Sequence, residues 1–242
     1  MAGQPQFPNE QTDTGEFKRQ TDAFRHWVTE DSRSGYPAAA GRYHLYVSLA
    51  CPWAHRTIIV RALKGLTHVV GMTIVDPIRD EQGWAFRNGP GHSLDTTNGF
   101  HFLSEAYRAT DPHYRRRVTV PVLWDSVTHR IVNNSDDDLM RIFNDEFNRF
   151  STTPLNLYPE ALRSQIDAMN DFLYERVNDG VYRAGFATSQ QVYEQAARSV
   201  FSALDELDIR LRDRRYLFGA QFVESDWRLF VTLLRFDAVY HG

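Results

Sequence analysis

The chain has 242 residues, 42% of them hydrophobic and 24% charged, which is the composition of an ordinary globular protein. Its formal net charge of −4 argues against a nucleic-acid binder, and no apolar run reaches the roughly 18 residues that a membrane span needs. The polar N-terminus lacks the pattern of a signal peptide, and the single cysteine excludes an intramolecular disulfide, so we expect a cytoplasmic protein that binds neither nucleic acid nor membrane.

Residues 1–40 show no sustained periodicity, which predicts an irregular N-terminal arm. Three aromatic side chains, Phe17, Phe24 and Trp27, are expected to anchor this arm on the body of the protein. Residues 42–49 alternate and are rich in aromatic and branched side chains, which predicts a β-strand.

The sequence CPWA at residues 51–54 follows this strand directly, and apolar residues recur after it at helical spacing. Proline is favoured at the first helical position, so we expect Pro52 to start a helix with Cys51 at or next to its N-cap. A helix N-terminus lowers a thiol pKa from about 8.5 to between about 3.5 and 7.5, and His55 and Arg56 add positive charge nearby. This placement predicts a reactive thiolate, and it is also compatible with a small buried cysteine that has no reactivity.

A two-cysteine thiol–disulfide enzyme would carry its second cysteine at position 54, where this chain has Ala54. Any disulfide chemistry must therefore pass through a mixed disulfide with an external thiol, for which glutathione is the main candidate. None of the nine histidines has metal-ligand spacing with a cysteine or carboxylate, and no phosphate loop or nucleophile elbow is present in the sequence. We therefore expect neither a metal nor a nucleotide cofactor.

The segment HVVGMTIV at residues 68–75 predicts a second strand, and residues 76–117 predict an irregular insertion of the kind that often carries function. Two further strands are predicted at residues 118–124 and 129–133, joined by a short turn. Pro121 inside the first of these fits a strand only at a sheet edge or as a cis-proline beside a site.

The remainder of the chain has helical patterns. The run Ser135-Asp136-Asp137-Asp138 opens one helix, with its carboxylates at the positive end of the helix dipole. Apolar spacing then marks three helices at residues 162–177, closed by Gly180, at residues 196–211 and at residues 227–234.

These elements predict three segments, which are an arm at residues 1–40, an α/β domain at residues 41–149 and an all-helical domain at residues 150–242. The chain stops soon after the third helix of the last segment, whose apolar stripe needs a partner surface. We therefore expect the helical domain to be incomplete at its C-terminus.

The run GRYHLYVSLACPWAHRTIIVRALKGL at residues 41–66 resembles the glutathionyl-hydroquinone reductases, also called the xi class of glutathione transferases and related to the omega class. The similarity extends to GEFKRQTDAFRHWV (15–28), VDPIRDEQGWAF (75–86), DPHYRRRVTVPVLWD (111–125), NDGVYRAGFATSQ (178–190) and TLLRFDAVY (232–240). The resemblance implies a thioredoxin-like α/β N-terminal domain followed by an all-α C-terminal domain of the glutathione-transferase type.

The resemblance also implies an enzyme that uses glutathione as cosubstrate to reduce glutathionyl-hydroquinones to hydroquinones. Cys51 would attack the thioether sulfur, release the hydroquinone and form a mixed disulfide, which a second glutathione would resolve. The aromatic leaving group is expected between the domains. Two alternatives remain open: an omega-like cysteine glutathione transferase or thiol reductase with other substrates, and a degenerate thioredoxin-like binding module without catalysis.

Further site residues follow from the same resemblance. Val120 matches the position whose backbone pairs with the cysteinyl part of glutathione, and Trp84 matches a residue that lines the glutathione site. Tyr182 matches a tyrosine that faces the hydroquinone and is expected to be catalytic together with Cys51. A core tryptophan and a half-buried helix tyrosine are the structural alternatives for Trp84 and Tyr182.

Two features depart from the family pattern. The family usually has Glu-Ser where this chain has Ser135-Asp136, and these two residues are expected to hold the γ-glutamyl end of glutathione, with Asp136 on its ammonium group. Loss of one charge-assisted contact there would weaken binding by about 1–3 kcal/mol. The family also continues through further helices that contribute to the dimer, so we expect a homodimer, if formed, to be weakened.

Overall fold

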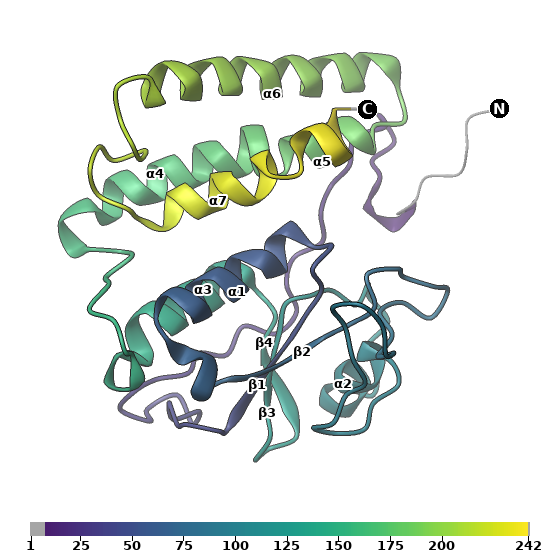
Figure 1. Ribbon diagram of the computed structural model, residues 1–242. Coiled ribbons are helices and arrows are strands. Elements are labelled where there is room, and N and C mark those ends of the chain that lie inside the picture. Colours follow the sequence, from purple (N-terminus) through teal and green to yellow (C-terminus); the bar gives the residue numbers. More distant parts are fainter. Residues whose placement is uncertain (1–7, 242) are drawn as a thin grey trace. The chain divides into compact units, whose positions relative to one another are not determined.

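Four short strands form a mixed sheet in the computed structural model, which describes residues 8–241. In chain order the strands are β1 (Tyr43–Val47), β2 (Gly71–Ile74), β3 (Val122–Asp125) and β4 (Arg130–Asn133). Their order across the sheet is β2-β1-β3-β4 (Figure 1). Strands β1 and β2 are parallel, with His44 opposite Gly71, whereas the β1–β3 and β3–β4 pairs are antiparallel.

Helix α1 (Pro52–Leu63) connects the two parallel strands, because parallel neighbours need a crossover connection rather than a tight turn. A short turn joins β3 to β4, and helix α3 (Asp136–Arg141) follows β4 and packs against α1. The β-α-β unit followed by a β-β-α unit confirms the thioredoxin-like fold expected for this part of the chain.

The sheet has a well-buried centre. Every residue of β3 is buried, and so are four of the five residues of β1. Trp53, Ala54 and Val60 on α1 are also buried, each at most 4% exposed. Because burial of apolar side chains holds both β1 and α1 in the core, the two ends of the connection between them are anchored.

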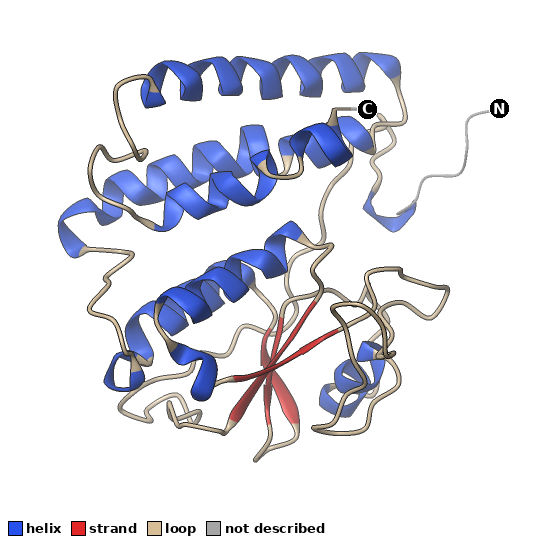
Figure 2. Ribbon diagram, viewed as in Figure 1, coloured by secondary structure: helices blue, strands red, loops and turns tan. Residues whose placement is uncertain are grey.

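The chain divides into two compact units. The first is Asp22–Asn156 and contains the sheet, and we call it the sheet unit. The second combines residues 157–241 with residues 8–21 and consists of helices and loops, and we call it the helical unit (Figure 2). The predicted arm at residues 1–40 is therefore shared between the two units, and its first seven residues lie outside the described part of the chain.

Three predictions about individual elements were wrong. The insertion at residues 76–117 contains helix α2 (Leu103–Thr110), whose buried face repeats at Leu103, Ala106, Tyr107 and Thr110. The third strand begins at Val122 instead of residue 118, and a cis peptide bond joins Val120 to Pro121 just before it. Gly180 begins a helix instead of ending one. The glycine lies where this helix approaches its neighbour closely, since a Cβ there would be 3.0 Å from Val200 Cγ2.

A buried carboxylate attaches the insertion to the sheet. Asp95 is 5% exposed and accepts a hydrogen bond from the Tyr46 hydroxyl on β1 at 3.1 Å. It also accepts backbone N–H bonds from Thr97, Asn98 and Phe100. Because Asp95 joins a strand to a turn of the insertion, it fixes the path of the loop that carries Trp84.

The helical unit contains α4 (Arg163–Leu173), α5 (Gly180–Gly185), α6 (Gln190–Leu211) and α7 (Glu224–Leu233). A π-helical turn, Tyr174–Asn178, follows α4 directly. The apolar core of this unit is formed by Leu173, Val177, Ala203, Leu207, Leu217 and Leu229. Within the described residues, no helix combines the length and apolar character that a membrane crossing requires.

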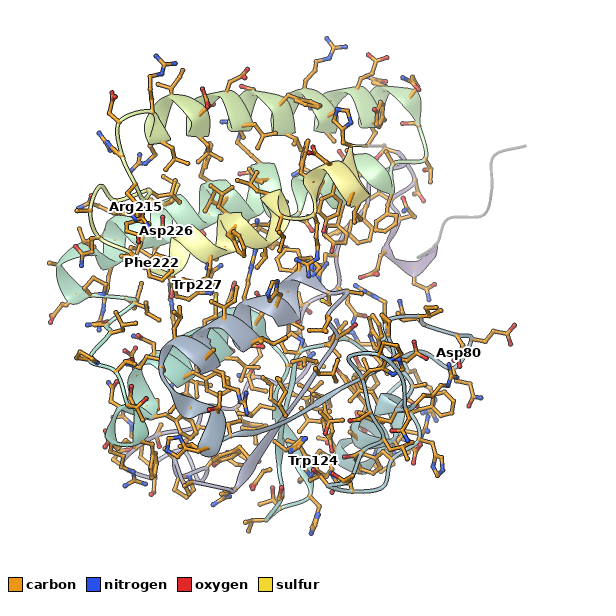
Figure 3. The ribbon with its side chains drawn as sticks, viewed as in Figure 1. Asp80, Trp124, Arg215, Phe222, Asp226 and Trp227 are labelled. Carbon is orange, nitrogen blue, oxygen red and sulfur yellow. The ribbon has the colours of Figure 1, made fainter. Side chains whose placement is uncertain are left out.

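Buried polar groups fix α7 against α4. Asn170 Nδ2 donates to Glu224 Oε1 at 2.6 Å, and Ser225 Oγ donates to Asn170 Oδ1 at 2.7 Å. At the start of α7, Asp226 accepts the backbone N–H groups of Val223 and Leu217, both at 2.8 Å (Figure 3). The Asn170 bonds therefore hold α7 on α4, and the Asp226 bonds hold the start of α7 on the loop before it.

The first part of the predicted arm packs on the helical unit. Gln11 Nε2 donates to the Phe186 carbonyl at 3.0 Å, and the Thr188 N–H donates to the Gly15 carbonyl at 3.0 Å. Phe17 is 4% exposed, and its ring centroid lies 5.2 Å from that of Phe186. The segment therefore belongs to the core of this unit.

The second part of the arm packs on the sheet unit. The Phe24 ring lies 5.7 Å from that of Tyr107 on α2, and Trp27 Nε1 donates to Glu146 Oε1 at 3.2 Å. Together with Phe17, these contacts confirm all three predicted aromatic anchors.

Candidate active site

Cys51 occupies the N-cap of α1, as predicted. Its backbone is extended, with φ −87° and ψ 117°, and Pro52 is the first helical residue. The sulfur accepts the N–H of Ala54 at 3.5 Å, and the thiol lies 3.7 Å from the Val120 carbonyl oxygen, to which it can donate. An N–H donor from the first turn is a contact that stabilises a negative sulfur, whereas the Val120 carbonyl accepts only from the protonated thiol.

Val120 lies beside Cys51, so the structure brings these two predicted site residues together. Val120 is 5% exposed and precedes the cis bond to Pro121. The preceding residue, Thr119, is held from two sides, because its carbonyl accepts the Tyr107 hydroxyl at 2.9 Å and its hydroxyl accepts Asn134 Nδ2 at 3.2 Å. The backbone opposite the sulfur is thus held by hydrogen bonds from two buried side chains, Tyr107 and Asn134.

Ser135 and Asp136 begin α3, with Ser135 as N-cap. Ser135 is 4% exposed, and its N–H donates to Asn133 Oδ1 at 2.8 Å. Asp136 Oδ2 accepts Arg56 Nη1 from α1 at 2.8 Å, and Asp137 Oδ1 is 3.7 Å from the same nitrogen. The two helices that meet at this site are therefore joined by an ion pair.

The role of Arg56 in this ion pair is the functional feature that the sequence does not reveal. Its side chain is 1% exposed, and its Cζ atom lies 4.5 Å from the ring centroid of Trp53. From the sequence we expect Arg56 to supply positive charge near Cys51, whereas the structure shows its guanidinium on the carboxylates of α3. Asp136 is 80 residues further along the chain, so no local pattern indicates this pairing.

Trp84 lies in the insertion, directly after a turn at Gly83 that has a φ of 97°. Its side chain is half-buried, so Trp84 is not a fully enclosed core residue. The Arg79 guanidinium lies over the ring, with Cζ 5.3 Å from the ring centroid, and the Trp84 carbonyl accepts the N–H of Leu103 at 2.9 Å. These contacts leave an aromatic surface partly accessible in the same unit as Cys51.

Tyr182 lies on α5 of the helical unit and is half-buried. Its ring stacks on Phe17 of the arm, with centroids 6.4 Å apart and planes inclined by 26°. The Arg19 guanidinium lies 5.6 Å from the same ring. Burial raises the pKa of Asp179, the N-cap of α5, against the lowering effect of the positive charges of Arg19 and Arg183.

A metal site does not emerge from the geometry. In the part of the chain that the structure describes, no group of three or more histidine, cysteine, aspartate or glutamate side chains is placed to hold an ion.

Comparison with known families identifies both units. The model of the glutathione S-transferase N-terminal domain matches residues 50–144, and the model of the C-terminal domain matches residues 190–242. The glutathionyl-hydroquinone reductase YqjG of Escherichia coli is 47% identical over 233 residues, which cover 93% of this chain and 71% of that protein. The glutathionyl-hydroquinone reductase PcpF of Sphingobium chlorophenolicum is 44% identical over 94% of this chain and 72% of its own length.

Solved structures agree with these relatives. The xi glutathione S-transferase of Phanerochaete chrysosporium superposes with a TM-score of 0.90 and 45% identity, covering 93% of this chain and 77% of that one. The glutathione-bound structure of YqjG superposes with a TM-score of 0.88 and 47% identity, covering 90% of this chain and 74% of that one.

Proposed function

Because this chain belongs to the glutathione transferases, and within them to the xi-class glutathionyl-hydroquinone reductases, we propose that it reduces glutathionyl-hydroquinones to hydroquinones with glutathione as the second substrate. The observation that carries this proposal is the position of Cys51, whose sulfur accepts an N–H from the first turn of α1 beside the Val120 carbonyl. Ala54 occupies the position of a resolving cysteine, so the second thiol must come from glutathione.

The first half-reaction transfers a glutathionyl group to Cys51. The thiolate attacks the thioether sulfur, a sulfur–sulfur bond forms and the bond from sulfur to the aromatic carbon breaks. The electron pair of that bond stays on the aromatic carbon, which takes up a proton and leaves as the hydroquinone. The thiolate is the nucleophilic form of cysteine, which is why hydrogen-bond donation from Ala54 to the sulfur favours this step.

The second half-reaction regenerates the enzyme. A glutathione thiolate attacks the glutathionyl sulfur of the mixed disulfide, oxidised glutathione leaves and Cys51 returns as a thiolate. The hydroquinone conjugate is thereby reduced at the expense of one glutathione, and one cysteine is sufficient. Because the proposed reaction consumes reduced glutathione, we expect it in a reducing compartment such as the cytoplasm.

The remaining site residues would bind the two parts of the substrate. We assign the backbone of Val120 to the cysteinyl part of glutathione, Trp84 to the wall of that site, and Ser135 with Asp136 to the γ-glutamyl end. Tyr182 is assigned to the hydroquinone, where its phenol would hydrogen-bond a ring hydroxyl. The partial exposure of Trp84 and Tyr182 and the position of Asp136 at the start of α3 support these assignments.

The proposal is tested by mass spectrometry after incubation with a glutathionyl-hydroquinone and no free glutathione. We expect one glutathione adduct on Cys51 and one equivalent of released hydroquinone. Cys51→Ser, which keeps the size of the side chain, should lose both while the circular dichroism spectrum stays unchanged. Turnover by Cys51→Ser above a few per cent of the wild-type rate would exclude Cys51 as the nucleophile.

A further inference from the structure

The two halves of the proposed glutathione site lie on different parts of the sheet unit. The backbone of Val120 precedes β3, whereas Ser135 and Asp136 follow β4 at the start of α3. A ligand that contacts both places gains the full benefit of both contacts only if their separation is held at one value. Two buried side chains that no step of the proposed reaction uses, Tyr107 and Asn134, connect these halves.

Tyr107 holds the backbone of the residue before Val120. It lies on α2 and is fully buried. Its hydroxyl donates to the Thr119 carbonyl at 2.9 Å and accepts the Thr119 N–H at 3.3 Å. Burial raises the pKa of the Tyr107 phenol, so the hydroxyl keeps its proton and remains a donor well above neutral pH. Both backbone polar groups of Thr119 therefore depend on one hydroxyl.

Asn134 joins this hydroxyl to the start of α3. It directly precedes Ser135 and is 2% exposed. Its Nδ2 donates to Thr119 Oγ1 at 3.2 Å and to the Tyr107 hydroxyl at 3.3 Å. The side chain of Asn134 therefore contacts the residue before Val120, while its own backbone leads into Ser135.

The orientation of Asn134 is fixed from the opposite side. Its Oδ1 accepts the Phe24 N–H at 2.8 Å, and its own N–H donates to the Phe24 carbonyl at 3.0 Å. The Phe24 ring packs edge-on against Tyr107, with centroids 5.7 Å apart. Because both polar atoms of the Asn134 amide have partners, the amide has one preferred orientation, and its bond to Thr119 has a fixed direction.

We propose that Tyr107 and Asn134 are positioning residues, which fix the spacing between the two halves of the glutathione site. They act on Val120 through Thr119, and Asn134 acts on Ser135 through the chain itself. This proposal rests on the proposed function, because the two halves are defined by the parts of glutathione assigned to them. Loss of the Tyr107 hydroxyl would release the Thr119 backbone on one side, so glutathione would bind to both halves less tightly.

The test is the rate at which Cys51 forms a mixed disulfide, measured by mass spectrometry against the concentration of two disulfides. Oxidised glutathione carries the groups that both halves bind, whereas bis(hydroxyethyl) disulfide carries neither. For Tyr107→Phe we expect the half-saturating concentration of oxidised glutathione to rise about three- to tenfold, the effect of one hydrogen bond. The rate with bis(hydroxyethyl) disulfide should stay unchanged, because it depends on the thiolate alone. A loss of fold would lower both rates.

Tyr114→Phe is the matched control. The Tyr114 hydroxyl donates to the Arg117 carbonyl at 2.9 Å, two residues before Thr119 in the same loop, and the Tyr114 ring also packs on Phe24. This variant removes the same kind of bond without changing the contacts of Thr119. The half-saturating concentration of oxidised glutathione should therefore stay at the wild-type value.

A second variant keeps the test decisive if Tyr107→Phe does not fold. Thr119→Val keeps the branched shape and removes the hydroxyl that accepts the Asn134 amide, so it should also raise the half-saturating concentration of oxidised glutathione. An unchanged value in either variant when folded, or an equal rise in Tyr114→Phe, would overturn the proposal. A wild-type rate that does not saturate with oxidised glutathione would overturn the proposed function itself, and this proposal with it.

Discussion

At the scale of single residues, the carboxylate of Asp136 already forms an ion pair with Arg56 of the same chain. Arg56 is 1% exposed and donates to this carboxylate at 2.8 Å. A buried guanidinium without a carboxylate costs several kcal/mol, so the pair has to persist in the folded chain. The ammonium group of glutathione would therefore meet an ion pair instead of a separate carboxylate. This is the physical consequence of having Asp136 at this position.

His44 on β1 predicts how stability depends on pH. Its ring nitrogens contact the hydroxyls of Thr73 at 2.8 Å and Thr97 at 3.2 Å, and burial lowers its pKa below the ordinary value of 6.5, although Asp95 acts to raise it. Between the folded and the unfolded pKa, the unfolded chain binds a proton that the folded chain excludes. The contribution of His44 to stability is therefore complete above about pH 6.5 and falls as the pH is lowered.

Urea unfolding at pH 7 and pH 5.5 measures this effect. Stability should decrease between the two pH values, and His44→Gln should reduce the decrease, because glutamine cannot take up the proton. His113→Gln, which changes an exposed histidine in the loop after α2, is the control and should keep the wild-type decrease. If the two variants show the same pH dependence, His44 is not the titrating group.

At the scale of residues, the sequence predicts features that depend on neighbouring residues, and it does not predict contacts between distant ones. Cys51 at the N-cap follows from a strand that leads into a proline-initiated helix, and this position was predicted. For Pro121 the sequence left two alternatives, a sheet edge or a cis-proline, and the structure has the cis bond. The Arg56–Asp136 and Tyr46–Asp95 contacts were not, since their partners are 80 and 49 residues apart. Such pairs are set by the packing of whole elements, and no pattern within one element reveals them.

At the scale of elements, α7 begins with half of a capping box. Asp226 at the third helical position accepts the Val223 N–H at 2.8 Å, but valine at the N-cap has no side-chain oxygen to accept an N–H in return, and the Asp226 N–H donates to the Val223 carbonyl at 3.0 Å. Val223→Thr has nearly the same shape and adds that oxygen. We expect it to raise the free energy of unfolding by about 1 kcal/mol, measured by urea denaturation.

The competing effect is the burial of a hydroxyl, because Val223 is fully buried beside Tyr158 and Ile166. Val223→Ala separates the two effects, since it loses the packing without adding an acceptor and should destabilise. If Val223→Thr destabilises as much as Val223→Ala, the hydroxyl does not reach the first turn and the capping argument is wrong.

The attachment of the N-terminal arm depends on Gly15. It has a φ of +90°, and a Cβ there would lie 2.7 Å from Thr188 Oγ1 and 3.2 Å from the Ser189 nitrogen. Gly15→Ala therefore adds a steric conflict to the strain of a positive φ, which is about 1 kcal/mol or more by itself. We expect the arm to detach, so that trypsin cleaves at Lys18 and Arg19 faster than in the wild type.

Gly35→Ala is the matched control for this prediction. Gly35 has a similar φ of +81°, but a Cβ there would meet no atom within 4 Å. This variant should show the backbone strain alone and leave trypsin cleavage at Lys18 and Arg19 unchanged. Equal cleavage rates in both variants would show that the contact with Thr188 does not hold the arm.

The order of elements was predictable, and several of their limits were not. Helix α2 was missed because its eight residues follow a segment rich in glycine and proline, although its buried positions repeat at helical spacing. From the sequence alone, Gly180 is predicted to end a helix. In the structure α5 and α6 approach closely, so that a Cβ at this position would lie 3.0 Å from Val200 Cγ2 and this side chain would have to shift slightly, which is a tertiary effect.

At the scale of the whole molecule, the proposed roles divide between the two units. Cys51, Trp84, Val120, Ser135 and Asp136 belong to the sheet unit, whereas Tyr182 belongs to the helical unit. Thiol chemistry and recognition of the aromatic group should therefore be separable by mutation.

Tyr182→Phe tests this separation. It removes one hydroxyl while the ring can keep its contacts with Phe17 and Arg19. A hydrogen bond contributes about 0.5–1.5 kcal/mol, so we expect kcat/KM for a glutathionyl-hydroquinone to fall about three- to tenfold. The rate at which Cys51 forms a mixed disulfide with oxidised glutathione should not change, because that reaction involves no aromatic group.

The pattern of the two rates decides the role of Tyr182. An equal loss in both reactions would mean that the hydroxyl supports the fold, and no loss in either would mean that the phenol does not contact the substrate. Tyr193→Phe, on the exposed side of α6, controls for the loss of a phenol elsewhere in the same unit and should leave both rates unchanged. A loss confined to the aromatic substrate would place the phenol on the hydroquinone, because the two reactions share the same thiolate and differ only in the leaving group.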